Sequence, residues 1–96
     1  MLYEMELYVT QSYDENAQIL KALSHPTRLR LLELIREKQP CVKYMEEILG
    51  VAQPNISQHL SLLRNMGIVS SNREGNQVCY KINNSLVINI LDTLKK

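Results

Sequence analysis

The stretch VAQPNISQHLSLLRNMGIV, residues 51–69, combines a helical apolar pattern with an unusual polar face. Ile56, Leu60 and Leu63 recur at the spacing that places apolar side chains on one side of a helix. An ordinary solvated helix face mixes Glu with Lys at paired positions, but no acid occurs between Glu47 and Glu74. The polar face of this helix instead consists of Gln53, Asn55, Ser57, Gln58, His59, Ser61 and Arg64.

Helices and strands are predicted on both sides of this stretch from periodicity and from Gly and Pro positions. Pro54 suits the first turn of the helix, and Gly67 ends it. The other predicted elements, in chain order, are helices over 14–23 and 27–38, a short strand at Cys41–Val42, a helix over 43–49, strands over 68–72 and 77–82 joined by a turn at 73–76, and a helix after a cap at Asn83 or Asn84.

The apolar positions of these elements predict the core. In the helices before Gly50 the inward-facing residues are predicted to be Ala17, Ile19, Leu20, Leu23, Leu29, Leu31, Leu32, Leu34, Ile35, Met45, Ile48 and Leu49. In the last helix the broad apolar face consists of Leu86, Val87, Ile90, Leu91 and Leu94. That last face is too wide for a small domain to cover alone, so it predicts a seam with a second copy, and Leu91 is expected within the seam.

This order of elements predicts a mainly α fold with a small β-hairpin. Two short helices joined by a Gly-containing turn and followed by a hairpin describe a winged helix-turn-helix, and 96 residues suffice for one such domain over 1–96. The second helix of the pair lies in the DNA major groove in such folds. Amides, hydroxyls, imidazole and guanidinium groups match base edges and phosphates, whereas acids would repel the phosphate backbone.

Composition and charge narrow the class of protein. The net charge is +1, but residues 1–50 hold six basic and eight acidic residues, and residues 51–96 hold five basic and two acidic ones. The second half is therefore suited to an anionic partner. No apolar run approaches the roughly 20 residues that span a bilayer, and the acidic start does not resemble a signal peptide. We expect a cytoplasmic protein with no membrane partner, in which Cys41 and Cys79 would normally be reduced.

Three segments together resemble the ArsR/SmtB family of bacterial repressors. They are LKALSHPTRLRLLELI (20–35), LGVAQPNISQHLSLLRNMGIV (49–69) and REGNQVCYKI (73–82), so the resemblance runs from Leu20 to Ile82. It implies a homodimer built by the first and last helices and a transcriptional repressor that binds double-stranded operator DNA. It also implies release from DNA by a metal ion or by thiol chemistry. A two-fold dimer is expected to bind an inverted repeat.

The resemblance also suggests roles for individual residues. Ser57 and His59 occupy the family positions for groove contacts, and Arg64 lies where it reaches only phosphate. At the hairpin tip, Arg73 is expected to contact DNA, and Asn76 is included in this interface. Arg28 and Arg30 are expected to be structural, and His25 is expected to be a helix-start residue and not a ligand.

The two cysteines are candidate sensor thiols. In winged helices the short strand before the third helix usually pairs with the returning strand of the hairpin, which would bring Cys41 close to Cys79. The alternative is that Cys41 is a small buried hydrophobe and Cys79 an incidental strand residue. A soft metal ion held by two thiolates is a further alternative, but Lys43 stands where metal-sensing relatives have a second Cys, and the last helix has Asp92 but no His.

Two other classes of function fit this sequence less well. No catalytic constellation is visible: no acid is placed to orient a Cys–His pair and no oxyanion motif occurs, so an enzyme is not expected. A winged helix that binds another protein, without specific DNA contacts, would explain the fold and the near-neutral charge. It would not explain the acid-free face of residues 53–64 together with Arg73 in the hairpin.

Overall fold

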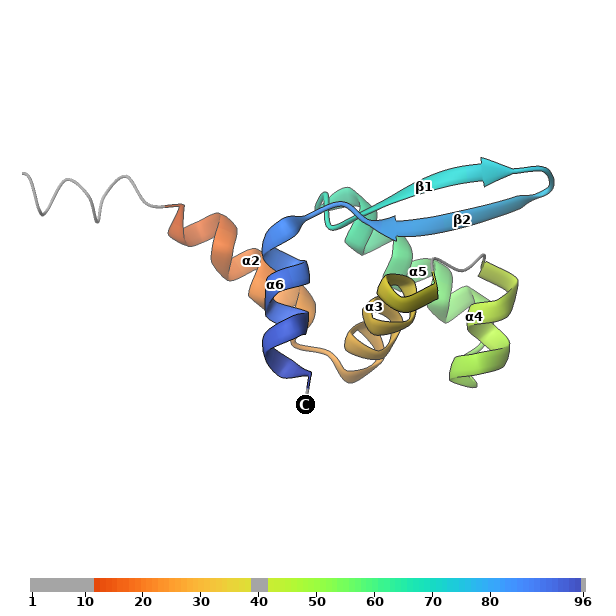
Figure 1. Cartoon of the computed structure of the whole chain (residues 1–96), viewed down its shortest axis with the longest axis horizontal. Helices are drawn as coiled ribbons and strands as arrows, with labels where there is room; N and C mark the ends of the chain where they lie inside the picture. The colour runs from red at the N-terminus through yellow and green to blue at the C-terminus, as the bar shows by residue number, and fades with distance from the viewer. Residues whose placement is uncertain (1–11, 39–41, 96) are drawn as a thin grey trace, which may run out of the picture.

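The computed structural model describes residues 12–38 and 42–95, and its elements follow the predicted order (Figure 1). The predicted helices, the hairpin and the winged helix-turn-helix fold are confirmed. The elements are α2 (Tyr13–Leu23), α3 (Pro26–Lys38), α4 (Val42–Leu49), α5 (Gln53–Asn65), β1 (Val69–Glu74), β2 (Gln77–Ile82) and α6 (Ser85–Leu94).

Helix α3 forms the centre of the core and packs against α2, α4 and β2 (Figure 1). Its Leu31, Leu32 and Ile35 are fully buried, as expected for apolar residues that recur on one side of a helix. Ile56, Leu60 and Leu63 of α5 join the same cluster. The predicted inward stripes of α3 and α5 are therefore confirmed, and these stripes fix which side of α5 remains outside.

Three of the residues predicted to face inward are exposed in a single copy of the chain, so these predictions are wrong there. Leu20 of α2 is 55% exposed and Ile48 of α4 is 59% exposed, and Ala17 is also exposed. Helical spacing identifies an apolar face but does not say how much of that face the rest of the chain covers. In α2 only Ala22 and Leu23 are buried, because α2 contacts the core near its C-terminal end.

The hairpin is tighter than the sequence predicted. Strands β1 and β2 pair in antiparallel register from Val69↔Ile82 to Glu74↔Gln77, which leaves a two-residue turn, Gly75–Asn76. Gly75 has φ of +63°, a conformation that favours glycine. The predicted turn at 73–76 is therefore too long at its start, because Arg73 belongs to β1.

The predicted strand at Cys41–Val42 is wrong for Val42, which is the first residue of α4. Cys41 lies outside the described residues. Within the described chain, the sheet has only the strands β1 and β2.

Helix α6 returns along the core and begins at the predicted cap. The side chain of Asn84 accepts a hydrogen bond from the Val87 amide at 3.2 Å, which satisfies one of the amides left without a partner at a helix start. Val87 and Leu91 of α6 are buried within one copy. Leu91 therefore belongs to the core of the protomer, and the expectation that it lies in a seam between copies is wrong.

Candidate nucleic-acid interface

The helix pair α4 and α5 places the polar face of α5 on the outside of the molecule. Gly50, with φ of +66°, follows α4, and Val51 and Ala52 connect it to α5. Ala52 occupies the cap position without a side-chain hydrogen bond, because its methyl group has no atom that can accept one. Because the opposite stripe is buried, six of the seven predicted polar residues of α5 are exposed: Gln53, Asn55, Ser57, Gln58, Ser61 and Arg64.

The seventh residue, His59, is only partly exposed because it contacts two residues from outside α5. Its Nδ1 atom lies 3.4 Å from Nη1 of Arg28 on α3. Its ring packs edge to face against the ring of His25, with centroids 4.7 Å apart. Burial, then His25, then Arg28 lower the pKa of His59 below its ordinary value. These surroundings therefore favour the neutral form of His59.

His25 and Arg28 have fixed positions of their own. The Nδ1 atom of His25 accepts a hydrogen bond from the amide of Thr27 at 3.1 Å, in the first turn of α3, as expected for a helix-start residue. Arg28 donates from Nε to the carbonyl oxygen of Ala22, at the end of α2. Sequence reasoning treated Arg28 as structural and missed its contact with His59. The contact becomes visible only in the folded chain, where residues 24–28 lie next to α5.

The hairpin places two more predicted residues on the surface. Arg73 lies in β1 opposite Val78, and Asn76 lies in the turn; both are exposed. A hairpin of this form presents a cation and an amide near its tip, where phosphate oxygens or a minor groove can be contacted. Strand β1 begins three residues after α5, following Met66, Gly67 and Ile68. The length of β1 therefore sets how far the hairpin tip lies from α5.

Of the two candidate thiols, only Cys79 lies among the described residues. It is 9% exposed and disulfide-bonded, and it lies in β2 opposite Asn72. Its sulfur is 3.6 Å from Oε2 of Glu74. Polar residues surround a hollow beside it: Ser71, Asn72, Glu74, Tyr80 and Lys81. Cys79 is thus a buried residue of the hairpin.

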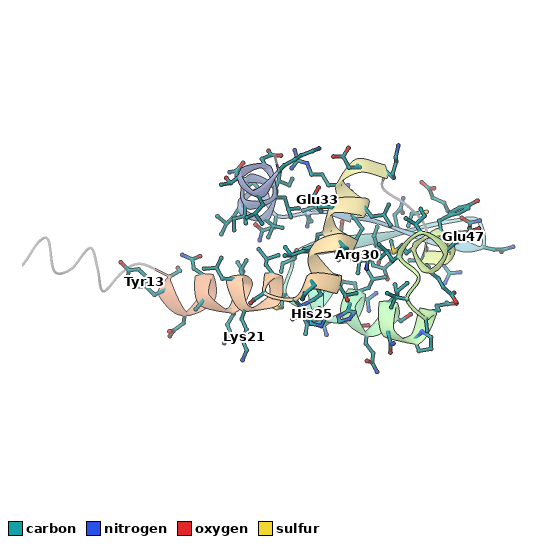
Figure 2. The ribbon with its side chains drawn as sticks, turned by 90° about the horizontal axis from the view of Figure 1, so that it is seen from below. Tyr13, Lys21, His25, Arg30, Glu33 and Glu47 are labelled. Atoms are coloured by element: carbon teal, nitrogen blue, oxygen red, sulfur yellow. The ribbon has the colours of Figure 1, made fainter. Side chains whose placement is uncertain are left out.

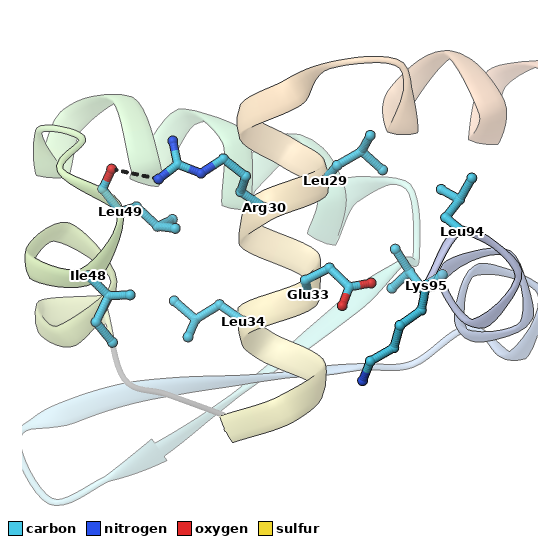
Figure 3. A pocket seen from close by; sticks show the side chains of 9 residues that line it. Leu29, Arg30, Glu33, Leu34, Ile48, Leu49, Leu94 and Lys95 are labelled. Atoms are coloured by element: carbon cyan, nitrogen blue, oxygen red, sulfur yellow. Dashed lines mark hydrogen bonds between the residues drawn. The ribbon is translucent and has the colours of Figure 1, made fainter.

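An apolar groove lies on another side of the molecule, between α3, α4 and α6 (Figure 3). Leu34, Ile48 and Leu94 contribute apolar side chains to it, which explains where the exposed Ile48 points. At one end, Arg30 donates from Nη2 to the carbonyl oxygen of Leu49 at 3.2 Å. Arg30 therefore helps to hold α4 against α3, as its predicted structural role requires.

Within residues 12–38 and 42–95, no three His, Cys, Asp or Glu side chains lie close enough together to hold a metal ion. None of the helices in this described part is long and apolar enough to cross a bilayer.

Comparison with known sequences places the helix-turn-helix in a family. Residues 25–71 match the model described as "Bacterial regulatory protein, arsR family". The repressor SmtB of Mycobacterium tuberculosis is 38% identical over 69 residues, which are 72% of this chain but 51% of SmtB. The chain thus spans about half the length of that relative. The repressor PagR of Bacillus anthracis is 36% identical over 84 residues, which are 86% of this chain and 84% of PagR.

Solved structures give the same fold. HlyU from Vibrio cholerae superposes with a TM-score of 0.83 at 26% identity, over 88% of this chain and 92% of HlyU. The fragment 1–100 of Mb0332 from Mycobacterium bovis, described as a homodimeric winged helix-turn-helix DNA-binding domain, gives a TM-score of 0.78 at 27% identity, over 85% of this chain and 76% of that chain. The sequence matches and the shared fold together show that this chain belongs to the ArsR family of bacterial regulatory proteins.

Proposed function

We propose that this protein is a transcriptional repressor that binds double-stranded operator DNA through α5 and the β1–β2 hairpin. The observation that supports this most directly is the exposed, acid-free polar face of α5, whose opposite stripe is buried. A helix with this face can enter the major groove and offer donors and acceptors to base edges. Both SmtB and PagR are named as repressors, which supports the view that this protein represses transcription and does not activate it.

The proposed roles follow the position of each residue. Ser57 and His59 lie mid-helix and contact base edges, and Gln53, Asn55, Gln58 and Ser61 complete the same face. Arg64, in the last turn of α5, contacts phosphate. Arg73 and Asn76 of the hairpin contact the backbone or the minor groove beside the site of α5. Regulation of operator DNA would place the protein in the cytoplasm.

We further propose that the whole chain forms one domain that acts as a homodimer, with α2 and α6 at the seam. Large apolar side chains remain exposed on these two helices: Tyr13, Leu20, Leu86 and Leu94. Such residues are normally covered by a partner, and the related Mb0332 fragment is described as homodimeric. A two-fold dimer would bind an inverted repeat whose half-sites are about 34 Å apart, or a multiple of that distance.

The proposed release signal is thiol chemistry at Cys41 and Cys79. The disulfide-bonded state of Cys79 supports this choice, as does its position in β2 of the hairpin. A covalent link there would restrain the hairpin and change its angle to α5. An oxidant or a reactive sulfur species could form such a link. A soft metal ion bound by the two thiolates is the alternative signal, although Lys43 replaces a ligand of the metal-sensing relatives.

The test begins with selection of the preferred duplex from random DNA, followed by affinity measurements as a function of salt. We expect an inverted repeat, and an affinity that falls steeply as salt rises because phosphate contacts release counterions. Ser57→Ala combined with His59→Ala should weaken specific binding about tenfold or more, with little change in binding to random duplexes. Ser24→Ala, at the exposed end of α2, is the matched control.

Two outcomes would contradict the proposal. Equal losses of specific and random binding in the double variant would show that α5 does not contact base edges. Failure to bind any duplex, at low salt as well, would favour a winged helix that binds another protein.

A further inference from the structure

The surroundings of His59 determine which of its ring nitrogens can face DNA. Figure 2 shows His25 at the junction of α2 and α3, next to α5. From that junction the ring of His25 packs on His59 at 4.7 Å between centroids, and Arg28 approaches Nδ1 of His59 with its Nη1 at 3.4 Å. Since Arg28 is also bound to the Ala22 carbonyl, its guanidinium cannot turn away from His59 freely.

The chemistry of this contact selects one tautomer. A guanidinium has donors and no acceptor, and it stays protonated in proteins. Its contact with Nδ1 is therefore favourable only if Nδ1 carries a lone pair, which requires a neutral imidazole with its proton on Nε2. A proton on Nδ1 would place two N–H groups against each other. The lowered pKa of His59 agrees with the neutral form.

We infer that Arg28 is a positioning residue that holds His59 as an Nε2–H donor toward DNA, and that this sets a preference for a hydrogen-bond acceptor on the base edge. The inference rests on the proposed function of α5. An N–H donor matches O6 or N7 of guanine, N7 of adenine or O4 of thymine, and it is mismatched with the N4 amino group of cytosine. Because Arg28 is bound to Ala22, the same contact connects the end of α2 to the α5 helix.

The matched control is Arg30, two residues further along α3. It is an exposed arginine that binds the Leu49 carbonyl, on the side of α3 that Figure 3 shows beside α4. Removal of Arg30 takes away the same charge from the same helix without touching His59. Arg28→Lys is a second test variant. It keeps the charge, but a lysine ammonium group cannot contact the Ala22 carbonyl and His59 at the same time, as the planar guanidinium does.

The experiment is ¹⁵N NMR of the imidazole nitrogens in the full-length protein without DNA, for wild type, Arg28→Ala, Arg28→Lys and Arg30→Ala. We expect the Nε2–H tautomer for His59 in wild type and in Arg30→Ala, with a titration midpoint below that of a free histidine. In Arg28→Ala the two tautomers should mix and the midpoint should rise. A wild-type His59 protonated on Nδ1, or a tautomer unchanged in both Arg28 variants, would overturn the inference.

DNA binding supplies the second readout. With the duplex selected for the wild type, both Arg28 variants should lose about tenfold in affinity and tolerate cytosine where the wild type requires an acceptor base. Arg28→Lys should keep the salt dependence of the wild type, because its charge remains. Retention of full base preference by both variants would overturn the inference. If the NMR result holds and no variant, wild type included, binds DNA, the proposed function fails and the tautomer assignment stands.

Discussion

Arg36 of α3 and Asp92 of α6 form an ion pair, with 2.8 Å between Nη2 and Oδ1. The same guanidinium donates from Nη1 to the carbonyl oxygen of Ile88 at 3.2 Å. One arginine thus holds α6 against α3 at two points separated by a helical turn. The ion pair is partly open to solvent, since the Arg36 side chain is 29% exposed and that of Asp92 is 51% exposed.

The first prediction separates these two contacts. Asp92→Ala removes a half-exposed ion pair, which screening by water limits to about 0–1 kcal/mol of the free energy of unfolding. Arg36→Ala also removes the hydrogen bond from this side chain to the Ile88 carbonyl, and its total cost should be about 1–2 kcal/mol. Chemical denaturation at one fixed protomer concentration measures both. Equal losses in the two variants would show that the Ile88 contact contributes nothing.

The second prediction concerns the proposed seam between copies. Leu86 of α6 is 42% exposed in one copy, so Leu86→Asp should leave the protomer folded and place a charge in the seam. The expected result is dissociation to monomers in analytical ultracentrifugation, with an unchanged far-ultraviolet spectrum. Asn89→Asp is the control, because it adds the same charge at an exposed position of the same helix. A tight dimer of Leu86→Asp would remove α6 from the seam.

The location of Leu91 shows what apolar spacing alone could predict. The pattern of α6 identified a broad apolar face correctly, but Leu91 is buried inside the protomer and Leu86 and Leu94 are exposed. Spacing gives the direction of a side chain around a helix axis. Which part of a wide face meets the rest of the chain depends on how the helices pack, and here that depends on long-range contacts such as Arg36 with Ile88.

The third prediction follows from the environment of His59. Burial, His25 and Arg28 lower its folded-state pKa below the value of about 6.5 that an unfolded chain retains. Above that value neither state binds the proton, and as pH falls through it the unfolded state binds the proton first. Wild type should therefore lose stability relative to His59→Gln between about pH 7 and pH 5. Unfolding free energies of both proteins across this range provide the measurement, and a relative gain for wild type would contradict the assignment.

The candidate interface was predictable from sequence to the extent that it depends on local pattern. The acid-free face of α5 is local, and its exposure at Ser57 and Arg64 follows from the buried stripe behind it. The contact between Arg28 and His59 joins residues 31 positions apart. No helical or strand period relates such positions, so only the packing of α3 on α5 could reveal that His59 is held from two sides.

The last prediction tests the proposed thiol sensor by intact-protein mass spectrometry and by operator affinity. The protein is first reduced and then treated with diamide, which accepts two electrons and two protons as two thiols form a disulfide. In wild type we expect the mass of one chain to fall by that of two hydrogen atoms, without intermolecular links, and a weaker affinity for the selected duplex. Cys41→Ser and Cys79→Ser should each abolish both changes, because either variant leaves one cysteine in the chain. Ser71→Ala, beside Cys79 in the hollow of the hairpin, should respond as wild type does. An affinity that does not change when the link forms would remove the thiols as the release signal and favour titration with soft metal ions as the next experiment.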